Sequence, residues 1–532
     1  MDNNRTILAV VLIVLLWSGY SLFFAPQQQV HQVATVDEAK KEIPVNNEVT
    51  KSKPVAVEPK SDDFINANKE ESFLTVSSDF FDIKLSTVGA TIRSIVLKNY
   101  KESNKADSNL FTLLNSDSFE LSTLQSFGSD GLYIPKNLNY NIIDNKQHVD
   151  INSEQVKVGF VASINNITIV KTYIFHPASY SFDINIKITN NSTNPVSGLF
   201  NMSLITAWDK DSKSAMYTFV GPVTYDGEKL QEDKPAKLEE SPKLYKNKIV
   251  WSGYSSKYFL NAIDPYESSE QLFINTGNGF VENKFTSGQI TLLTDQEASF
   301  DYTSYFGPKD DKFLVAAGHQ FDDVINYGFF HPLSKPLMVV LKFFYKFIGN
   351  YGFAIILLTV CIKLIFWPLT QKSYKSMKGM QKLQPEMKKM REKYGSDKQK
   401  LNQEMMAFYK ENKVNPMGGC LPMIIQIPVF FALYRVLLGS IELRHAPFML
   451  WITDLSAKDP YYVTPLIMGV TMFLQQKMTP TNMDPTQEKI MLMMPVVFTF
   501  MFLNFPAGLV LYWLTNNVLT ILQQYLIRRQ PD

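Results

Sequence analysis

The sequence predicts a polytopic α-helical membrane protein that carries a large antiparallel β-sandwich domain. Two observations predict this class. Long apolar stretches are concentrated at the two ends of the 532-residue chain. The middle, from about Gln27 to Phe330, is polar and contains many short segments in which apolar and polar residues alternate. The overall net charge of +1 and mean hydropathy of -0.09 conceal this division. At this length we expect more than one domain.

The first apolar stretch predicts an uncleaved membrane anchor over residues 1–26. It has no charge from Thr6 to Pro26, which is longer than the roughly 7–15-residue apolar core of a signal peptide. Phe23 stands where a cleavage site would need a small residue, and Arg5 favours a cytoplasmic N-terminus. The alternative is a cleaved signal peptide.

Residues 27–60 predict a flexible tether, because their few large apolar groups cannot bury enough surface to fold. The pattern changes at about Ser61, and residues 61–330 predict the β domain. In YSFDINIKIT, for example, Phe182, Ile184 and Ile186 fall on one side and polar residues on the other. Many such strands without intervening helices indicate an antiparallel sandwich.

Residues 331–350 predict an amphipathic helix lying in the membrane interface. Lys342 and Lys346 are one helical turn apart, and aromatic residues occupy the other faces. The alternative is a linking helix that packs on the β domain.

The remaining residues, 351–532, predict a five-helix membrane core. The candidate spans are about 351–370, 419–440, 464–478, 490–505 and 508–527. With the anchor they make six, so both termini should lie on one side. The loop 371–417 has a net charge of +7, and Arg528 and Arg529 follow the last span. Positive charge marks the cytoplasmic side, so we expect the termini and this loop inside and the β domain outside.

The loop 371–417 predicts a cytoplasmic helical hairpin that turns at YGSD. Methionine is flexible and suits contact with varied apolar partners. Four methionines are therefore candidate contacts for such partners: Met377, Met380, Met387 and Met405. The alternative is that they form ordinary core between two helices. The basic outer face could also attract anionic headgroups or ribosomal RNA.

Lys363 lies inside the apolar stretch from Tyr351 to Thr370, where a charge costs about 2.5–3.5 kcal/mol on insertion scales. About 10 Å of helical rise separates it from Thr370, so the side chain could snorkel to the cytoplasmic surface. No Asp or Glu occurs in any of the five spans. An unpaired cation among polar residues suits the reception of a transient anionic or polar guest.

Other functional classes lack their motifs. Cys361 and Cys420 give neither a disulfide framework nor metal-ligand spacing, and the six histidines form no His-x-x-x-His pair. The β domain has no nucleophile elbow, phosphate loop or paired-carboxylate motif. We therefore expect a protein that is not an enzyme and needs no metal or cofactor.

The chain resembles the YidC-type membrane protein insertases of Gram-negative inner membranes along essentially its whole length. The most specific segments are NPMGGCLPMIIQIPVFFALY (415–434), DLSAKDPYYVTPLIMGVTMF (454–473) and FPAGLVLYW (505–513). LQPEM and QEMMAFYK in the basic loop also match. The resemblance implies a periplasmic β-supersandwich, and a five-helix core around a hydrophilic groove that opens to the cytoplasm and the lipid but is closed to the periplasm. It also implies that the cytoplasmic hairpin receives clients, which makes its four candidate methionines client contacts.

The same resemblance implies the groove residues. The family's groove cation, usually arginine, falls on Lys363, and its polar neighbours fall on Thr359, Gln426 and Tyr512. Lysine keeps the charge but loses the multi-donor fork. Arg435 is not expected from the family, and snorkelling to the periplasmic face would explain it. The implied partners are nascent membrane proteins, the Sec translocon, the ribosome and membrane lipids, and not DNA.

Two other functions stay open from the residues themselves. A secondary transporter would need a coupling carboxylate and inverted repeats, and neither is visible in the sequence. A membrane-anchored periplasmic carbohydrate-binding protein would place its activity in the β domain.

Overall fold

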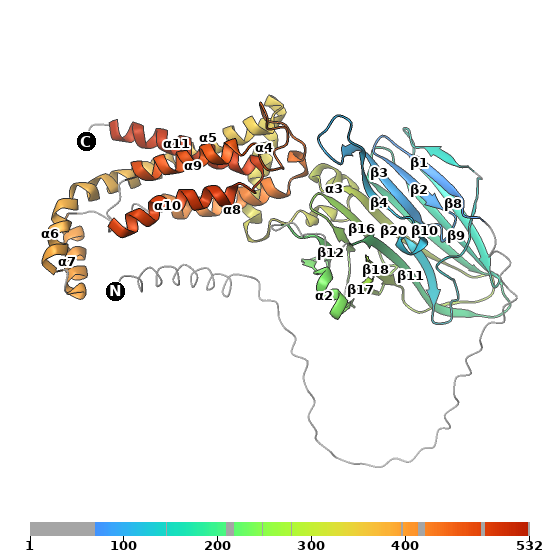
Figure 1. Cartoon of the computed structure of the whole chain (residues 1–532). Coiled ribbons are helices and arrows are strands. Elements are labelled where there is room, and N and C mark those ends of the chain that lie inside the picture. Colours follow the sequence, from blue (N-terminus) through green and yellow to red (C-terminus); the bar gives the residue numbers. More distant parts are fainter. Residues whose placement is uncertain are drawn as a thin grey trace, which may run out of the picture. The chain divides into compact units, whose positions relative to one another are not determined.

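The computed structural model describes residues 70–529 except 145, 209–217, 247, 278, 395–396, 413–420 and 480–484 (Figure 1). These residues belong to one compact unit, Asp62–Asp532. The predicted anchor (1–26), the tether (27–60) and Cys420 lie outside the described residues, as do the ends of the chain beyond them.

The described part of the β domain forms three sheets. The first contains β1 (Phe73–Ser77), β2 (Phe81–Ser86), β3 (Ile92–Lys101), β4 (Leu110–Asn115) and β7 (His148–Asp150), in the order β4-β3-β2-β1-β7. The second contains β6 (Asn141–Ile142), β8 (Val156–Ile164), β9 (Ile167–Phe175), β10 (Ser181–Asn190), β12 (Gly221–Tyr225), β13 (Leu230–Glu232), β15 (Trp251–Ser255), β16 (Phe259–Asp264) and β20 (Glu297–Pro308). The third contains β5 (Gln125–Ser129), β11 (Val196–Ala207), β14 (Lys243–Tyr245), β17 (Gln271–Gly277), β18 (Phe280–Thr286) and β19 (Ile290–Leu292).

Alternation decides which face of each strand is buried. In β10, Phe182, Ile184 and Ile186 are buried, and Ile184 lies opposite Tyr173 of β9 and Tyr302 of β20. The inward residues of the sheets share one apolar core. One pairing departs from the predicted antiparallel pattern, because β7 pairs with β1 in parallel. Between β4 and β7 the chain contributes β5 and β6 to the other two sheets, and such a long excursion permits a parallel arrival at β1, which a tight hairpin does not.

Lys171 is fully buried in this core. It occupies an inward position of β9, between Ile169 and Tyr173. Its ammonium group donates to the carbonyl oxygen of Leu124 at 2.6 Å, and Ser126 Oγ lies at 3.4 Å. Burial lowers the pKa of Lys171 to about 7. The core of the β domain therefore contains a cation without a carboxylate partner among the described residues.

Short helices follow the last strand and lead to the helical region. They are α3 (Asp311–Ala317), η2 (Phe321–Val324) and η3 (Gly328–Phe330); η1 (Phe119–Leu121) and α2 (Pro235–Glu240) lie earlier in the β domain. The later helices are α4 (His331–Ile348), α5 (Tyr351–Lys382), α6 (Gln384–Tyr394), α7 (Lys398–Glu411), α8 (Leu421–Gly439), η5 (Ile441–Leu443), α9 (Val463–Met478), α10 (Pro485–Phe502) and α11 (Ala507–Arg529).

The corner between α4 and α5 is built from two residues. Gly349 ends α4 in the left-handed conformation at a φ of 69°, which glycine adopts without a Cβ penalty. The side chain of Asn350 then caps α5 by accepting from the backbone N–H groups of Gly352 and Phe353. The Phe448 ring lies against Gly352, where a Cβ would come within 2.0 Å of it. This corner fixes where α5 begins.

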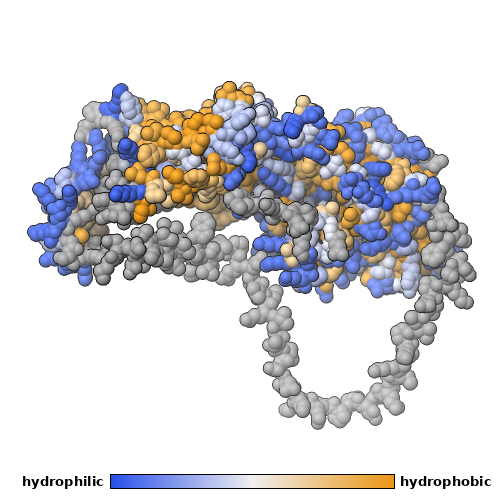
Figure 2. All heavy atoms as spheres, viewed as in Figure 1, coloured by the Kyte–Doolittle hydropathy of each residue, from blue (hydrophilic) through white to orange (hydrophobic). Residues whose placement is uncertain are grey.

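The outer faces of the helices are apolar. Leu364 and Ile365 of α5 are 61% and 72% exposed, and α9 and α10 expose Val470 and Phe500. Figure 2 shows hydrophobic residues covering this part of the surface. Among the described residues, α5 alone is long and apolar enough to be recognised as a membrane span by length and composition, whereas Ile425–Gly439 and Lys489–Phe502 are shorter apolar helices.

The loop 440–462 links the β domain to the helices through specific contacts. The Arg444 guanidinium donates to the Lys101 carbonyl oxygen and lies over the Phe111 ring. Asn104 donates to Thr453 Oγ1 at 2.8 Å. The same loop accepts the start of α11, because the Ala507 N–H donates to the Ala457 carbonyl oxygen. One loop therefore contacts both the β domain and the beginning of the last helix.

We predict that Lys171 makes the stability of the protein depend on pH. The folded pKa lies below the ordinary value of 10.5, so the unfolded chain binds the proton more readily between these values. The cost of burying the ammonium group is fully present below pH 7 and disappears as the pH rises toward 10.5. Below pH 7, Lys171→Met should therefore be stabilised relative to the unsubstituted protein. The difference in free energy of unfolding between the two proteins should shrink by about 1.4 kcal/mol for each pH unit between about 7 and 10.

Thermal unfolding of the full chain in detergent at several pH values measures this difference. Lys157→Met on the neighbouring strand β8, where the lysine is exposed, is the matched control and should show no such trend. A difference between Lys171→Met and the unsubstituted protein that stays constant with pH would contradict the assignment.

Candidate functional site

The candidate site lies where α5, α8 and α11 approach one another. The three helices share one apolar core with α4, and α11 packs mainly against α5 and α9. Both α5 and α11 begin beside the loop 440–462: Asn350, just before α5, donates to the Phe448 carbonyl oxygen, and Ala507 pairs with Ala457. A residue of α5 and a residue of α11 that are equally far from the first residues of their helices therefore lie at similar heights along the helix bundle.

Lys363 reaches sideways from α5 to α11. Its ammonium group donates to the Thr520 hydroxyl oxygen at 2.8 Å. Lys363 is twelve residues into α5 and Thr520 thirteen residues into α11, which places them about 18 and 20 Å from the starts of their helices. The side chain therefore contacts a residue at its own height instead of extending toward Thr370. Lys363 forms no ion pair with any residue that the structure describes.

The contact continues into a network that joins three helices. Thr520 donates its own hydroxyl proton to the Asn516 carbonyl oxygen at 2.6 Å. The Asn516 side chain in turn accepts from Gln426 Nε2 of α8 at 2.5 Å. Lys363 and Gln426, predicted to be groove neighbours, are thus connected through α11. Their distance in sequence hides this connection.

Thr359 and Tyr512 flank the network. Thr359 lies one turn before Lys363 and is buried, and its hydroxyl donates to the Ile355 carbonyl oxygen of its own helix at 2.7 Å. The Thr359 hydroxyl can therefore still accept a hydrogen bond from a guest, but it has no proton left to donate. Tyr512 is buried one turn before Asn516; its hydroxyl lies near the Gln426 amide but forms no hydrogen bond of normal geometry with the described residues.

Polar residues continue along the same face of α11 beyond the predicted ones. Asn517 donates to Thr471 of α9 at 3.4 Å, and Gln524 donates to the Tyr374 hydroxyl of α5 at 2.7 Å. Gln523 is only 1% exposed, and neither amide atom has a partner among the described residues. Thr520, Gln523 and Gln524 were not among the residues predicted from the sequence. They follow Asn516 by four, seven and eight residues, which is the spacing of one helix face, and this pattern could have predicted them.

An aromatic cluster closes the space between α8 and α11 on the side of the loop 440–462. The Phe430 ring lies 4.7 Å from the Trp513 ring and 6.3 Å from the Tyr512 ring, as measured between centroids. The ring centroids of Tyr434 and Phe505 are 6.1 Å apart. Trp513 precedes Thr520 by seven residues, or about 10 Å of helix. The site thus consists of an aromatic layer nearer the β domain and a polar layer farther from it.

Comparisons with known proteins assign the chain to a family. Residues 343–532 match the family described as 60Kd inner membrane protein, and residues 74–340 match the family described as YidC periplasmic domain. A membrane protein insertase YidC of Geotalea uraniireducens is 43% identical over 99% of both chains. The chain belongs to the YidC family of membrane protein insertases. The β domain is therefore the periplasmic domain of an inner-membrane protein family.

A further relative and two solved structures are also similar to this chain. The membrane protein insertase YidC of Geobacter sulfurreducens is 46% identical over 84% of this chain and 85% of its own. A crystal structure of an active YidC insertase is 18% identical, covers 87% of this chain and 94% of its own, and gives a TM-score of 0.38. A YidC structure from Thermotoga maritima is 15% identical over 86% of this chain and 98% of its own, with a TM-score of 0.30.

In this YidC family member, the predicted client-contacting methionines lie in different surroundings. Met377 and Met380 belong to the end of α5, which continues through Lys382, and both are half-buried. Met387 of α6 is buried, and its sulfur accepts from the Tyr409 hydroxyl of α7. This burial favours the alternative of hairpin core at Met387, and client contact there stays a prediction. Met405 is half-buried on α7.

We predict that Thr520 stabilises the protein specifically through Lys363. Thr520→Val removes the oxygen that accepts from the ammonium group, and a hydrogen bond to a charged group contributes about 1.5–3 kcal/mol. The same substitution should cost much less when Lys363 is already methionine. A double-mutant cycle measured by unfolding in mixed micelles gives the coupling energy. Thr515→Val serves as the control on the same helix, and equal costs of Thr520→Val in both backgrounds would rule out the contact.

Proposed function

We propose that this protein inserts membrane proteins into the inner membrane, and helps them fold and assemble, by offering their polar segments a hydrated, positively charged recess within a five-helix core. The core consists of α5, α8, α9, α10 and α11. The single observation that carries the proposal is the position of Lys363, which is held sideways at membrane depth by a neutral hydroxyl. Because its partner is neutral, the full positive charge is available to a guest.

Hydration of the recess is supported by the polar face of α11. The Gln523 amide is buried and has no partner among the described residues. Buried polar groups in folded proteins are nearly always paired, and water satisfies those that lack a protein partner. Water around Asn516, Thr520 and Gln523 would lower the cost of moving a polar tail into the membrane, which is otherwise several kcal/mol for each unpaired polar group.

Access from the cytoplasm alone is supported by the aromatic layer. Phe430, Tyr434 and Trp513 fill the side of the site nearer the periplasmic domain. With both termini and the loop 371–417 in the cytoplasm, the polar layer faces the side from which clients arrive. The resemblance to the family and the net charge of +7 on that loop support this orientation.

The short length of α9 supports a path for the client through a locally thinned membrane. α9 has 16 residues, or about 24 Å of helix, which is less than the roughly 30 Å hydrocarbon layer. A short helix thins the surrounding bilayer and so shortens the apolar path that a polar tail crosses. The apolar span of the client meanwhile enters lipid, and burial of its surface at about 25 cal/mol per Å² drives release without nucleotide or catalytic residue.

Delivery of clients is assigned to the basic hairpin α6–α7 and the adjoining end of α5. Met377, Met380, Met387 and Met405 remain the proposed client contacts, and Met387 is the most buried of them. Nascent membrane proteins are the clients. The Sec translocon, the ribosome and membrane lipids are the further partners, and the family resemblance supports them.

We predict that Lys363→Glu abolishes insertion of clients with acidic tails, whereas Lys363→Arg preserves it. A carboxylate would repel the tail inside a poorly solvated recess, which should lower insertion by at least about tenfold. Liposomes reconstituted with the purified protein and supplied with a client whose tail is acidic or neutral measure the effect.

Lys477→Glu is the matched control, because it makes the same change of charge at an exposed position in the last turn of α9. It should leave the ratio of acidic-tail to neutral-tail insertion near that of the unsubstituted protein. Equal insertion of the acidic client by Lys363→Glu, Lys363→Arg and the unsubstituted protein would refute the role of the cation.

A further inference from the structure

A cavity of about 780 Å³ lies between the β domain and the helices α4 and α8. Its volume is within the roughly 300–1,000 Å³ range of small-molecule sites. The β domain supplies residues from β13, the ends of β15 and β20, and the turn η2. The helices supply residues from the first three turns of α4 and the last turns of α8. The proposed insertion site between α5, α8 and α11 shares none of these lining residues except the neighbouring Tyr434.

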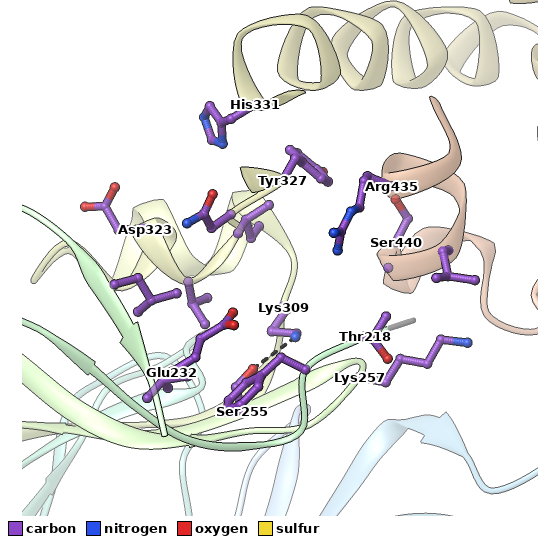
Figure 3. Close-up of a pocket in the computed structure, with 18 of the residues that line it drawn as sticks. Thr218, Glu232, Ser255, Lys257, Lys309, Asp323, Tyr327, His331, Arg435 and Ser440 are labelled. Carbon is purple, nitrogen blue, oxygen red and sulfur yellow. Dashed lines mark hydrogen bonds between the residues drawn. The ribbon is translucent and has the colours of Figure 1, made fainter. Parts of the chain in front are cut away.

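Five of the charged side chains that line the cavity lie on two sides of it. The lining also includes an ion pair between Lys342 and Glu442 at 2.6 Å, together with Lys234, Lys335, Asp311 and Asp322. Figure 3 shows Glu232 and Asp323 on one side, Arg435 and Lys257 on the other, and Lys309 between them. Lys309 donates to the Ser255 hydroxyl at 3.1 Å. Arg435 points into the cavity from α8, four residues before the end of that helix, and forms no hydrogen bond or ion pair with the described residues. The cavity therefore presents a cationic side and an acidic side to one guest.

The surrounding protein leaves the central charges incompletely compensated. Burial lowers the pKa of Lys309 to about 8, although Glu232 opposes this shift. Glu232 is exposed, yet its partial enclosure raises the pKa of its carboxyl. The positive charges of Lys309 and Arg435 lower this pKa, but by less than the enclosure raises it. An anion near Lys309 and a cation near Glu232 would each favour the charged form of its neighbour.

Part of the helical wall of the cavity is apolar, beside the charged side chains of Lys335 and Lys342. Met338 and Val339 of α4 and Leu438 of α8 line it, and Val339 is 62% exposed. Beyond this wall α4 exposes Val340, Phe343 and Phe347, which suits contact with the acyl region of a membrane. A guest with a charged head in the cavity could therefore continue as an apolar chain along these helices.

We propose that this cavity binds the headgroup of a phospholipid that carries both a phosphate and a primary amine, as in phosphatidylethanolamine. The phosphate would lie among Arg435, Lys257 and Lys309, and the ammonium group would face Glu232 and Asp323. The lipid belongs to the outer leaflet, because the periplasmic domain forms the opposite wall. Its role is to fasten that domain to the membrane surface beside α4, independently of the route that clients take.

The chemistry of the two sides selects among lipids. A headgroup without an amine, such as that of phosphatidylglycerol, would leave Glu232 and Asp323 without a cation. A quaternary amine, as in phosphatidylcholine, has no N–H group to donate to these carboxylates. Free inorganic phosphate would satisfy only the cationic side and would not contact Met338 or Leu438.

Native mass spectrometry of the full chain released from nanodiscs tests the proposal. The nanodiscs contain equal amounts of phosphatidylethanolamine, phosphatidylglycerol and phosphatidylcholine. We expect the unsubstituted protein to retain phosphatidylethanolamine preferentially, and Arg435→Gln to retain it about tenfold less, since a hydrogen bond to a charged group is lost. Glu232→Gln should abolish the preference for phosphatidylethanolamine over phosphatidylglycerol. Lys346→Gln, on α4 but outside the cavity, is the matched control and should behave as the unsubstituted protein.

A second measurement separates binding from misfolding. Phosphatidylethanolamine added to the protein in detergent should raise the midpoint of thermal unfolding of the unsubstituted protein and of Lys346→Gln, but not that of Arg435→Gln.

Equal retention of all three lipids by every variant would overturn the proposal, because it would indicate ordinary surrounding lipid. Displacement of the lipid by an excess of inorganic phosphate would assign the cavity to a free anion, and displacement by an acidic peptide would assign it to a protein tail. Either result would overturn the lipid assignment. None of these outcomes bears on insertion, which Lys363→Glu tests separately.

Discussion

The proposed function depends on one hydrogen bond, from the ammonium group of Lys363 to the hydroxyl of Thr520. A charge at this depth costs a few kcal/mol on insertion scales, so the helices around it must offer polar groups at the same height. α11 does this with a face of Asn516, Thr520 and Gln523, while the outer faces of α5, α9 and α10 stay apolar. A neutral partner holds the cation in place without cancelling its charge. A carboxylate in the same position would have fixed the side chain and removed the property that the proposed function needs.

The rest of the fold places this contact at a defined height and closes one side of it. The Gly349–Asn350 corner fixes the start of α5, and the pairing of Ala507 with Ala457 fixes the start of α11. The aromatic rings of Phe430 and Trp513 fill the space nearer the β domain. The loop 440–462, which supports both helix starts, also carries Arg444, whose guanidinium contacts Lys101 and Phe111 of the β domain. The periplasmic domain and the helix starts are therefore positioned by the same segment.

The sequence predicted the features that arise from local patterns and missed those that arise from distant contacts. Alternation identified the buried face of β10, and a lone charge in an apolar stretch identified Lys363. Thr520 was missed because a threonine in an apolar helix is common and its partner lies 157 residues earlier. The parallel pairing of β7 follows from a long connection that has no local signature. Lys171 could have been found, since it occupies an inward position in the alternation of β9. The cavity near Arg435 combines segments from both domains, so no single stretch of sequence predicts it.

The central claim is that Lys363 lies in a hydrated recess that opens to the cytoplasm, and cysteine accessibility tests it most directly. Cys361 and Cys420 are first replaced by serine, and a single cysteine is then placed at Lys363 or at Ile365, two residues away on the apolar outer face. Sealed vesicles of both orientations are treated with a water-soluble maleimide that does not cross membranes. The account predicts labelling at position 363 only when the cytoplasmic face is outside, and little labelling at position 365 in either orientation. Position 363 remaining as unreactive as position 365 would show a dry interior and contradict the account.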